Sequence, residues 1–247
     1  MAKYAHDEVV PYQQSQLPKQ EQVADMFNSI AYRYDFLNRF LSGGIDIWWR
    51  KKAIRELDKT RPGHILDVAT GTADVALMTW EMLKPEKITG IDISEGMLAL
   101  GRKKIEKAGL SEQIKLLKGD STSLPFTANQ FDAITVAFGV RNFQDLEAGL
   151  KEMYRVLHPG GKLVILEFSK PKKGVLAGLF LFYMNRITPL IGKIFAKNAS
   201  AYTYLNHSMQ AFPEGQQLLN ILNDAGFTQT YLKKLSFGIC TIYCGSK

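Results

Sequence analysis

Between residues 60 and 170, short apolar runs alternate with longer stretches in which apolar residues recur every three or four positions. The apolar runs have the length of buried strands, and the stretches between them have the spacing of amphipathic helices. The predicted strands are residues 65–69, 87–92, 114–118, 131–138 and 162–168. Strands that alternate with helices form βαβ units, so this region predicts a parallel sheet covered by helices on both faces.

The segments on either side of this region predict additions to the same sheet. Residues 22–40 and 48–58 have helical spacing and predict an N-terminal helical cap. After a further helix at residues 213–225, we expect an antiparallel pair of strands at residues 228–235 and 238–244. The predicted architecture is therefore a doubly wound, mostly parallel seven-stranded α/β sheet.

The chain of 247 residues has the length of one large domain. Residues 1–20 are polar and predict a flexible N-terminal segment, whereas residues 21–247 predict a single domain. An apolar and basic insert, at about residues 170–213, precedes the last helix, and we expect it to act as a lid over the substrate.

The positive charge of the chain is concentrated in this insert. The sequence has 31 Lys and Arg against 24 Asp and Glu, a net charge of +7. No acid occurs between Glu167 and Glu214, and the cations there are Lys170, Lys172, Lys173, Arg186, Lys193 and Lys197. Polar residues and a proline interrupt the apolar stretch at residues 175–195, which excludes a membrane span of about 18–20 residues. An amphipathic segment at an anionic membrane surface and an ordinary core helix both stay open.

Composition excludes several other classes of protein. With 46% hydrophobic and 22% charged residues, the chain is not a disordered one. The first residues lack the apolar region of a secretory signal, so we expect a cytoplasmic protein with reduced thiols. Cys240 and Cys244 have no nearby histidine, so we expect no metal site.

A glycine loop follows the first predicted strand, at the edge of the sheet where ligands bind in this architecture. Asp67 ends the strand, and Gly71 allows a tight turn and a close approach of a ligand to the backbone. Ala73 and Ala76 occupy the second and third glycine positions of the dinucleotide-binding pattern, which disfavours a nicotinamide or flavin site.

Acids end the next two strands as well. Asp92 follows the second strand, where a carboxylate can accept hydrogen bonds from both hydroxyls of a ribose. Asp120 and Ser121 follow the third strand, where they can contact an adenine edge. Three acids at neighbouring strand ends suit a cationic nucleoside without a phosphate, such as a sulfonium. The alternative is that each aspartate only caps the next helix.

The glycine loop, Asp92 and Asp120 resemble the motifs of class I S-adenosylmethionine-dependent methyltransferases. In that fold, a glycine loop follows the first strand and acids follow the next two. Further segments resemble the signatures of the ubiquinone/menaquinone biosynthesis C-methyltransferases. They are residues 34–42 with Trp49, residues 138–142, and residues 155–161 with residues 167–169. Leu37, Asp46 and His158 depart from this family, which has Met, His and Lys there.

The resemblance covers the chain from Gln22 to its C-terminus and implies S-adenosylmethionine as the cofactor. It implies that Thr72, Asp92, Asp120 and Ser121 contact that cofactor. It also implies a prenylated quinol as the methyl acceptor. The Gly-Thr-Ala-Asp form of the loop favours a naphthoquinol over the alternative benzoquinol.

Transfer to a ring carbon requires that the neighbouring hydroxyl lose its proton. Arg141 is our candidate for stabilising the quinolate, because a guanidinium keeps its proton, and Asn142 is our candidate for holding Arg141 or a ring oxygen in place. Asp35, Asp74 or a bound water are candidates for the base. Tyr34 is a further candidate for the active site, although it also fits a core aromatic residue.

Other interpretations stay open. In the first interpretation, the methyl acceptor is a different small apolar molecule. In the second, the chain is a membrane-binding module without catalytic activity. In a third, Arg141 only pairs with Asp145. A nucleic-acid methyltransferase is disfavoured, because no Asn/Asp-Pro-Pro-aromatic stretch follows the fourth strand. The expected partners are therefore the quinol and an anionic membrane surface, with no nucleic acid and with a homodimer left open.

Overall fold

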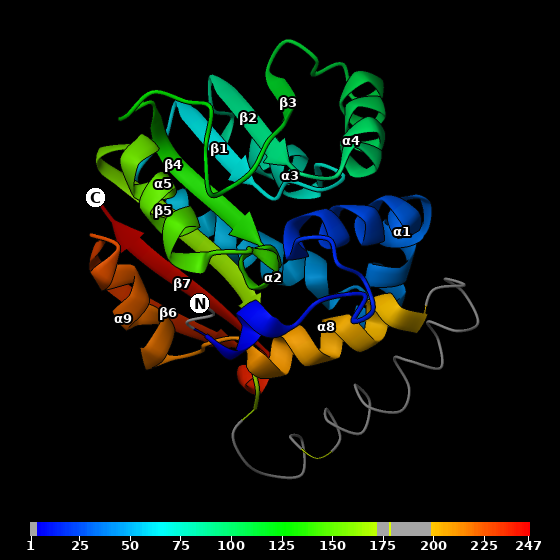
Figure 1. Ribbon diagram of the computed structural model, residues 1–247. Helices are drawn as coiled ribbons and strands as arrows, with labels where there is room; N and C mark the ends of the chain where they lie inside the picture. The colour runs from blue at the N-terminus through cyan, green and yellow to red at the C-terminus, as the bar shows by residue number, and fades with distance from the viewer. Residues whose placement is uncertain (1–3, 172–177, 179–198) are drawn as a thin grey trace.

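The computed structural model describes residues 4–171, 178 and 199–247 and contains a sheet in the order β3-β2-β1-β4-β5-β7-β6 (Figure 1). Its strands are β1 (His64–Val68), β2 (Lys87–Asp92), β3 (Ile114–Lys118), β4 (Phe131–Ala137), β5 (Leu157–Phe168), β6 (Thr228–Leu235) and β7 (Cys240–Ser246). The first five strands are parallel, whereas β7 is antiparallel to β5 and β6. The predicted doubly wound, mostly parallel seven-stranded sheet is confirmed.

Among the described residues, each α-helix except the one at residues 199–211 matches a predicted helical stretch, and residues 199–211 lie in the predicted insert. The α-helices of the described residues are α1 (Lys19–Ser42), α2 (Ile45–Ile54), α3 (Asp74–Leu83), α4 (Glu95–Lys107), α5 (Leu146–Val156), α8 (Ala199–Ala211) and α9 (Gln216–Asp224). Most of the predicted insert, residues 172–177 and 179–198, lies outside the described residues. In the part of the chain that the structure describes, no helix is long and apolar enough to cross a membrane.

Several element boundaries differ from the sequence prediction. The predicted turn at residues 158–161 is an irregular part of β5, because Phe131 pairs with Leu157 and Ala133 pairs with Lys162. The pairing leaves residues 158–161 as a bulge. The last helix begins at Gln216 rather than at residue 213.

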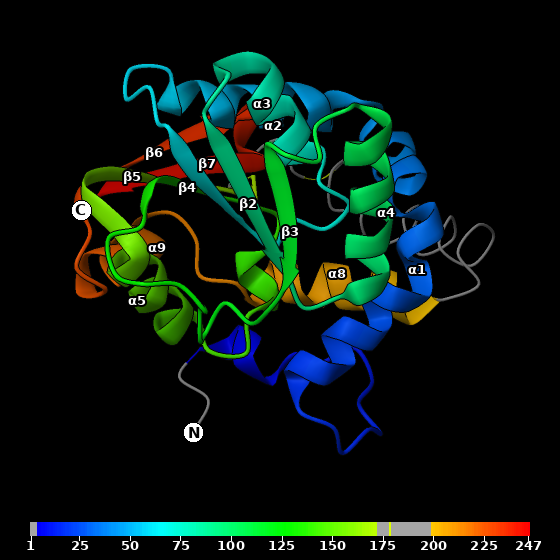
Figure 2. The same cartoon turned by 90° about the horizontal axis from the view of Figure 1, so that it is seen from above.

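Helices cover both faces of the sheet (Figure 2). On one face α2 and α4 contribute Trp49 and Leu98 to a buried cluster with Ile88 of β2. On the other face α5 and α9 contribute Leu150 and Leu222 to a second cluster. Burial on both faces explains why the parallel strands are continuously apolar rather than alternating.

The helices α1 and α8 form a separate layer beside the carboxyl ends of the strands (Figure 1). Val23, Met26 and Leu37 of α1 form a buried cluster with Ala201 and Tyr204 of α8. The α1 helix ends at Gly43, whose φ of 58° is left-handed, and this turn allows α2 to fold back onto the sheet. The predicted helical cap is thus present, and α8 completes it.

The N-terminal segment, which we expected to be flexible, makes specific contacts in its described part. His6 is buried, and its ring contacts the ring of Phe212 edge-on. The Lys19 ammonium donates a hydrogen bond to the His6 carbonyl, at 2.7 Å. The Tyr4 hydroxyl donates to Glu147 of α5. Burial of aromatic side chains holds residues 4–8 against the domain, which the polar composition of the segment did not reveal.

The order of the strands reverses between β1 and β4, and a crevice opens outside the carboxyl ends of two such strands. The connections that follow these strands approach each other closely there. A Cβ atom on Gly139 would lie 2.6 Å from the Cβ of Ala69, so only glycine fits at this position. Ala69 and Phe138 adopt left-handed φ values of 54° and 58°, which is strained backbone for both residues.

Candidate active site

Two adjoining hollows lie at this edge of the sheet. The first, here called the strand-end cleft, comprises about 680 Å³, part of it open to solvent, between α1 and the ends of β1, β2 and β4. The second, here called the apolar cavity, comprises about 1030 Å³, also partly open to solvent, between α1, α2 and α8. Both are lined by Phe27, Tyr34, Phe138 and Asn142. A group bound in the cleft therefore lies next to a group bound in the cavity.

Asp67 supports the glycine loop from below. Its carboxylate is buried and accepts hydrogen bonds from the hydroxyls of Thr70, at 2.7 Å, and Thr135, at 2.6 Å. Burial raises the pKa of Asp67 to about 6. The residue does not line the strand-end cleft, although Gly71 above it does. Asp67 thus holds the loop in place, and the expected contact with a cofactor falls to its neighbours.

Asp92 lines the cleft and fixes the loop from the side. Its Oδ2 accepts the backbone N–H of Gly71 and its Oδ1 that of Ser94, both at 2.8 Å. Burial raises its pKa, while these backbone hydrogen bonds oppose the rise. A carboxylate has about four lone-pair sites, so Asp92 keeps capacity to accept a further hydrogen bond beyond those from the backbone. Asp92 is thus able to accept from a ribose hydroxyl.

Asp120 and Ser121 line the same cleft beyond β3. The Asp120 carboxylate accepts the backbone N–H of Thr122, at 2.9 Å, which fixes the turn. Met97 and Phe143 supply apolar walls, so the cleft combines carboxylates with surfaces for a flat ring. These residues fit a cationic adenine nucleoside, because the acids attract positive charge and accept from its hydroxyl and amino groups.

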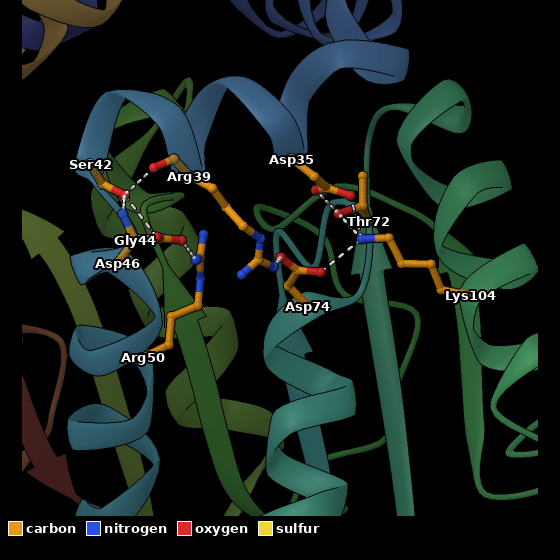
Figure 3. A network of polar contacts seen from close by, with 9 residues as sticks. All are labelled: Asp35, Arg39, Ser42, Gly44, Asp46, Arg50, Thr72, Asp74 and Lys104. Carbon is orange, nitrogen blue, oxygen red and sulfur yellow. Dashed lines mark hydrogen bonds and ion pairs between the residues drawn. The ribbon is translucent and has the colours of Figure 1, made fainter.

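Asp35, Asp74 and Thr72 meet in a polar network outside both hollows (Figure 3). The Lys104 ammonium lies 2.5 Å from Asp35 and 2.7 Å from Asp74, and it donates to the Thr72 hydroxyl at 2.9 Å. Arg39 donates to the other oxygen of Asp74, also at 2.7 Å. The network ties α1 to the β1–α3 loop and to α4. The structure thus brings the two base candidates together, but beside two cations and away from the cavity.

The apolar cavity has mostly hydrophobic walls, and Arg141, Asn142 and Tyr204 form what is here called its polar end. Besides the shared Phe27 and Phe138, its apolar lining residues are Met26, Ile30, Leu37, Leu41, Trp49, Phe168, Ala201, Leu205 and Ile239. Asp46 and Arg50 form a buried ion pair at its edge, and Ser42 donates to Asp46 at 2.8 Å. Asp46, which replaces the histidine of the family pattern, thus serves here as a partner for Arg50.

Arg141 lies at the polar end of the cavity and is nearly fully buried. Its Nη1 donates to Glu167, at 2.7 Å, and to the carbonyl of Phe138, also at 2.7 Å. The alternative pairing with Asp145 is wrong, because that carboxylate caps α5 by accepting the N–H of Ala148. Arg141 thus lines the cavity in a position fixed by these two bonds.

Glu167 and Tyr204 belong to this polar end, and we did not predict either of them. Glu167 is the next-to-last residue of β5, the fifth strand, so the rule that strand ends bind ligands could have identified it. Burial raises its pKa, and the nearby guanidinium of Arg141 opposes that rise. Tyr204 carries no comparable signal, because only the packing of α8 against α1 brings it to the cavity.

Tyr34 lines both hollows, and burial raises the pKa of its hydroxyl. Asn142 also lines both. Among the described residues no group of three His, Cys, Asp or Glu side chains is placed to hold a metal ion. Cys240 and Cys244 are buried free thiols on β7.

The sheet, the acidic cleft at its switch point and the adjoining cavity define a class I S-adenosylmethionine-dependent methyltransferase. The family model of the ubiE/COQ5 methyltransferase family matches residues 15–247, and the chain belongs to this family. It is 49% identical to a demethylmenaquinone methyltransferase of Bacteroides fragilis, over 99% of each chain. It is 44% identical to a ubiquinone/menaquinone biosynthesis C-methyltransferase UbiE of Geobacter sulfurreducens, over 93% of this chain and 90% of the other.

Solved structures with the same fold have diverged much further in sequence. A SAM-dependent methyltransferase of Thermotoga maritima is 22% identical, with a TM-score of 0.62 over 91% of this chain and 99% of that one. The [4+2]-cyclase SpnF is 19% identical, with a TM-score of 0.68 over 93% and 96%. At this identity the likeness concerns the fold alone. Proteins of one fold can catalyse different reactions.

Asp92→Asn tests the role of the strand-end carboxylate. We expect the affinity for S-adenosylmethionine to fall about 10–100-fold, because charge-assisted hydrogen bonds contribute about 1.5–3 kcal/mol each. Titration calorimetry measures the affinity. The matched control is Asp132→Asn, since Asp132 likewise accepts two backbone N–H groups, from Gly63 and His64, but does not line the cleft. Equal affinity in Asp92→Asn and the wild type would contradict the assignment.

The buried Asp67 predicts a specific pH dependence of stability. Its pKa of about 6 in the folded chain lies above the ordinary 3.8, so the folded state binds this proton more tightly. The resulting stabilisation is complete below about pH 4 and is lost as the pH rises through about 6. We expect Asp67→Asn, which has no such proton to lose, to gain about 2–3 kcal/mol relative to the wild type over this range. Urea unfolding at several pH values measures the difference, and a constant difference refutes the idea.

Proposed function

We propose that this methyltransferase converts demethylmenaquinol, a prenylated naphthoquinol, to menaquinol by C-methylation with S-adenosylmethionine. The observation that carries the proposal is the wall shared by the acidic strand-end cleft and the apolar cavity, formed by Phe27, Tyr34, Phe138 and Asn142. A cationic donor and an apolar acceptor with polar ring oxygens match these two spaces. Relatives named demethylmenaquinone methyltransferase, in Bacteroides fragilis and Porphyromonas gingivalis, support the naphthoquinol.

When bound, the cofactor would supply a methyl group attached to a sulfonium. The thioether left after transfer is neutral, so its departure requires no general acid. Residues of this chain have the task of holding the ring carbon in line with that methyl group. Orientation of this kind lowers a barrier by about 7–11 kcal/mol. Tyr34 and Phe138 are placed to do so, because they face both spaces.

The remaining task is to stabilise the quinolate. Arg141 is suited to it, because its charge is fixed by Glu167 and it lines the apolar cavity. Asn142 is placed to orient a ring oxygen. Among the three candidates for the base, a bound water is favoured, since Asp35 and Asp74 are held by Lys104 away from the cavity.

A prenylated benzoquinol is the second candidate acceptor, because a relative at 44% identity is named for both ubiquinone and menaquinone biosynthesis. Methyl transfer from labelled S-adenosylmethionine to a demethylated naphthoquinol and to a benzoquinol with the same tail separates the two. We expect faster turnover of the naphthoquinol. Transfer to neither quinol, by an enzyme that binds the cofactor, would favour a different small apolar acceptor.

Arg141→Lys tests the stabilisation of the quinolate. Lysine keeps the charge but loses the planar guanidinium, in which Nη1 bonds both Glu167 and the Phe138 carbonyl while Nε–H has no partner. We expect kcat to fall about 10²–10³-fold, the usual effect of removing an oxyanion donor. Calorimetry is expected to find an unchanged affinity for S-adenosylmethionine, because Arg141 does not line the strand-end cleft.

The control for this variant is Arg155→Lys. Arg155 also pairs with a glutamate, Glu152, and donates to the backbone carbonyls of Phe126 and Leu124, yet it lines neither hollow. If both lysine variants lose the same activity, the effect of Arg141 is not specific to the site.

We further propose that the enzyme, located in the cytoplasm, binds the anionic inner face of the cell membrane. Its prenylated substrate is dissolved in that membrane. The support is the run without acids between Glu167 and Glu214, which holds six cations. Exposed aromatic side chains of α1 and α2, Tyr32, Phe36 and Trp48, add to it. The lid role of the insert and a homodimer stay predictions.

Vesicle flotation with anionic lipid tests the membrane contact. We expect charge reversal at Lys170, Lys172, Lys173 and Lys193 to abolish flotation, because each cation near such a surface contributes about 1 kcal/mol. The control reverses four exposed lysines near the amino ends of the strands, namely Lys59, Lys87, Lys107 and Lys115. Unchanged flotation after the first set of reversals would refute this contact.

A further inference from the structure

Unsatisfied polar atoms are concentrated at the polar end of the apolar cavity. Among the described residues, several buried side-chain nitrogen and oxygen atoms have no hydrogen-bond partner. Four of them are Arg141 Nε, Asn142 Oδ1, Glu167 Oε2 and Tyr204 Oη. Three of these residues line the cavity, and Glu167 is bonded to one of them. A buried atom without a partner costs about 1–3 kcal/mol, so four at one place indicate a polar ligand.

The four atoms have a definite chemical pattern. Arg141 Nε–H is a donor, Asn142 Oδ1 and Glu167 Oε2 are acceptors, and the Tyr204 hydroxyl is both. A quinol ring has two hydroxyls, each able to donate one hydrogen bond and to accept others. The polar end of the cavity therefore complements the head group of a quinol.

Tyr204 is the member of this set to which the proposed reaction assigns no role. It comes from α8, its side chain is 3% exposed, and its ring packs with Val23, Met26 and Leu37 of α1. Burial raises the pKa of its hydroxyl, so the group stays protonated at neutral pH. It can therefore donate a hydrogen bond but cannot act as the base.

We propose that Tyr204 is a further catalytic residue, whose hydroxyl donates a hydrogen bond to the quinol oxygen that becomes the quinolate. Glu167 is a positioning residue that acts by holding Arg141 at the same oxygen. This inference rests on the proposed function and extends it, because it assigns the head group of the substrate to a site built by β5, α8 and the segment after β4.

The purely structural alternative is that Tyr204 only packs α8 against α1. Phenylalanine keeps that packing and removes the unsatisfied hydroxyl, so Tyr204→Phe is expected to fold with equal or greater stability. The two roles then differ in activity alone. The control is Tyr243→Phe, because Tyr243 is buried in the same chain but its hydroxyl accepts the N–H of Gly215 and it lines neither hollow.

The experiment measures labelled methyl transfer to the naphthoquinol as a function of pH. For Tyr204→Phe we expect kcat to fall about 10–100-fold, and the acidic limb of its pH profile to move to higher pH, because the bound quinol loses a hydrogen bond that favours its ionised form. Affinity for S-adenosylmethionine should not change. Tyr243→Phe should match the wild type in kcat and pH profile.

A double-mutant cycle tests the role of Glu167. If Glu167 acts through Arg141, the effects of Glu167→Gln and Arg141→Lys on kcat are not additive, whereas additive effects overturn that role. A wild-type kcat and pH profile in Tyr204→Phe overturn the inference about Tyr204 while leaving the proposed function intact. Absence of methyl transfer by the wild type overturns the proposed function itself, and both assignments with it.

Discussion

The site depends on how two buried carboxylates hold the loop between β1 and α3. Asp92 binds the backbone N–H of Gly71, and Asp67 binds the hydroxyls of Thr70 and Thr135 below it. Backbone in the left-handed region at Ala69 and Ala73 would not persist without such support. These bonds join the loop after β1 to β2, and β1 itself to β4. The loop and the cleft are therefore held rigidly at the place where the strand order reverses.

Rigidity at the loop contrasts with incomplete bonding at the cavity. Arg141 has one nitrogen satisfied by Glu167 and Phe138 and another without a partner, and Tyr204 has an unused hydroxyl. Such atoms lower the stability of the folded chain, so the core around them must compensate. This distribution supports our proposal of a prepared cleft for the cofactor and of a polar end whose bonding only a polar acceptor completes.

Whether a feature could be predicted from the sequence depends on how far apart in the chain the interacting residues lie. The strands and the acids at their ends were predictable, because buried parallel strands are apolar and a carboxylate after one of them lies at a known edge. Asp35 and Asp74 were expected near the substrate, but Lys104 of α4 holds them elsewhere. The burial of His6 was equally hidden, since it depends on contact with Phe212, far away in the chain.

The sequence by itself determined the α/β architecture, the acidic edge and the family, because periodicity, glycine loops and signatures are local patterns. Only the tertiary structure decided which polar groups share a cavity. Arg141 meets Glu167 from β5 and a tyrosine from α8, residues that no local pattern connects. The physical reason is that side-chain contacts across a sheet edge depend on strand order and helix packing, which are set by the burial of the whole core.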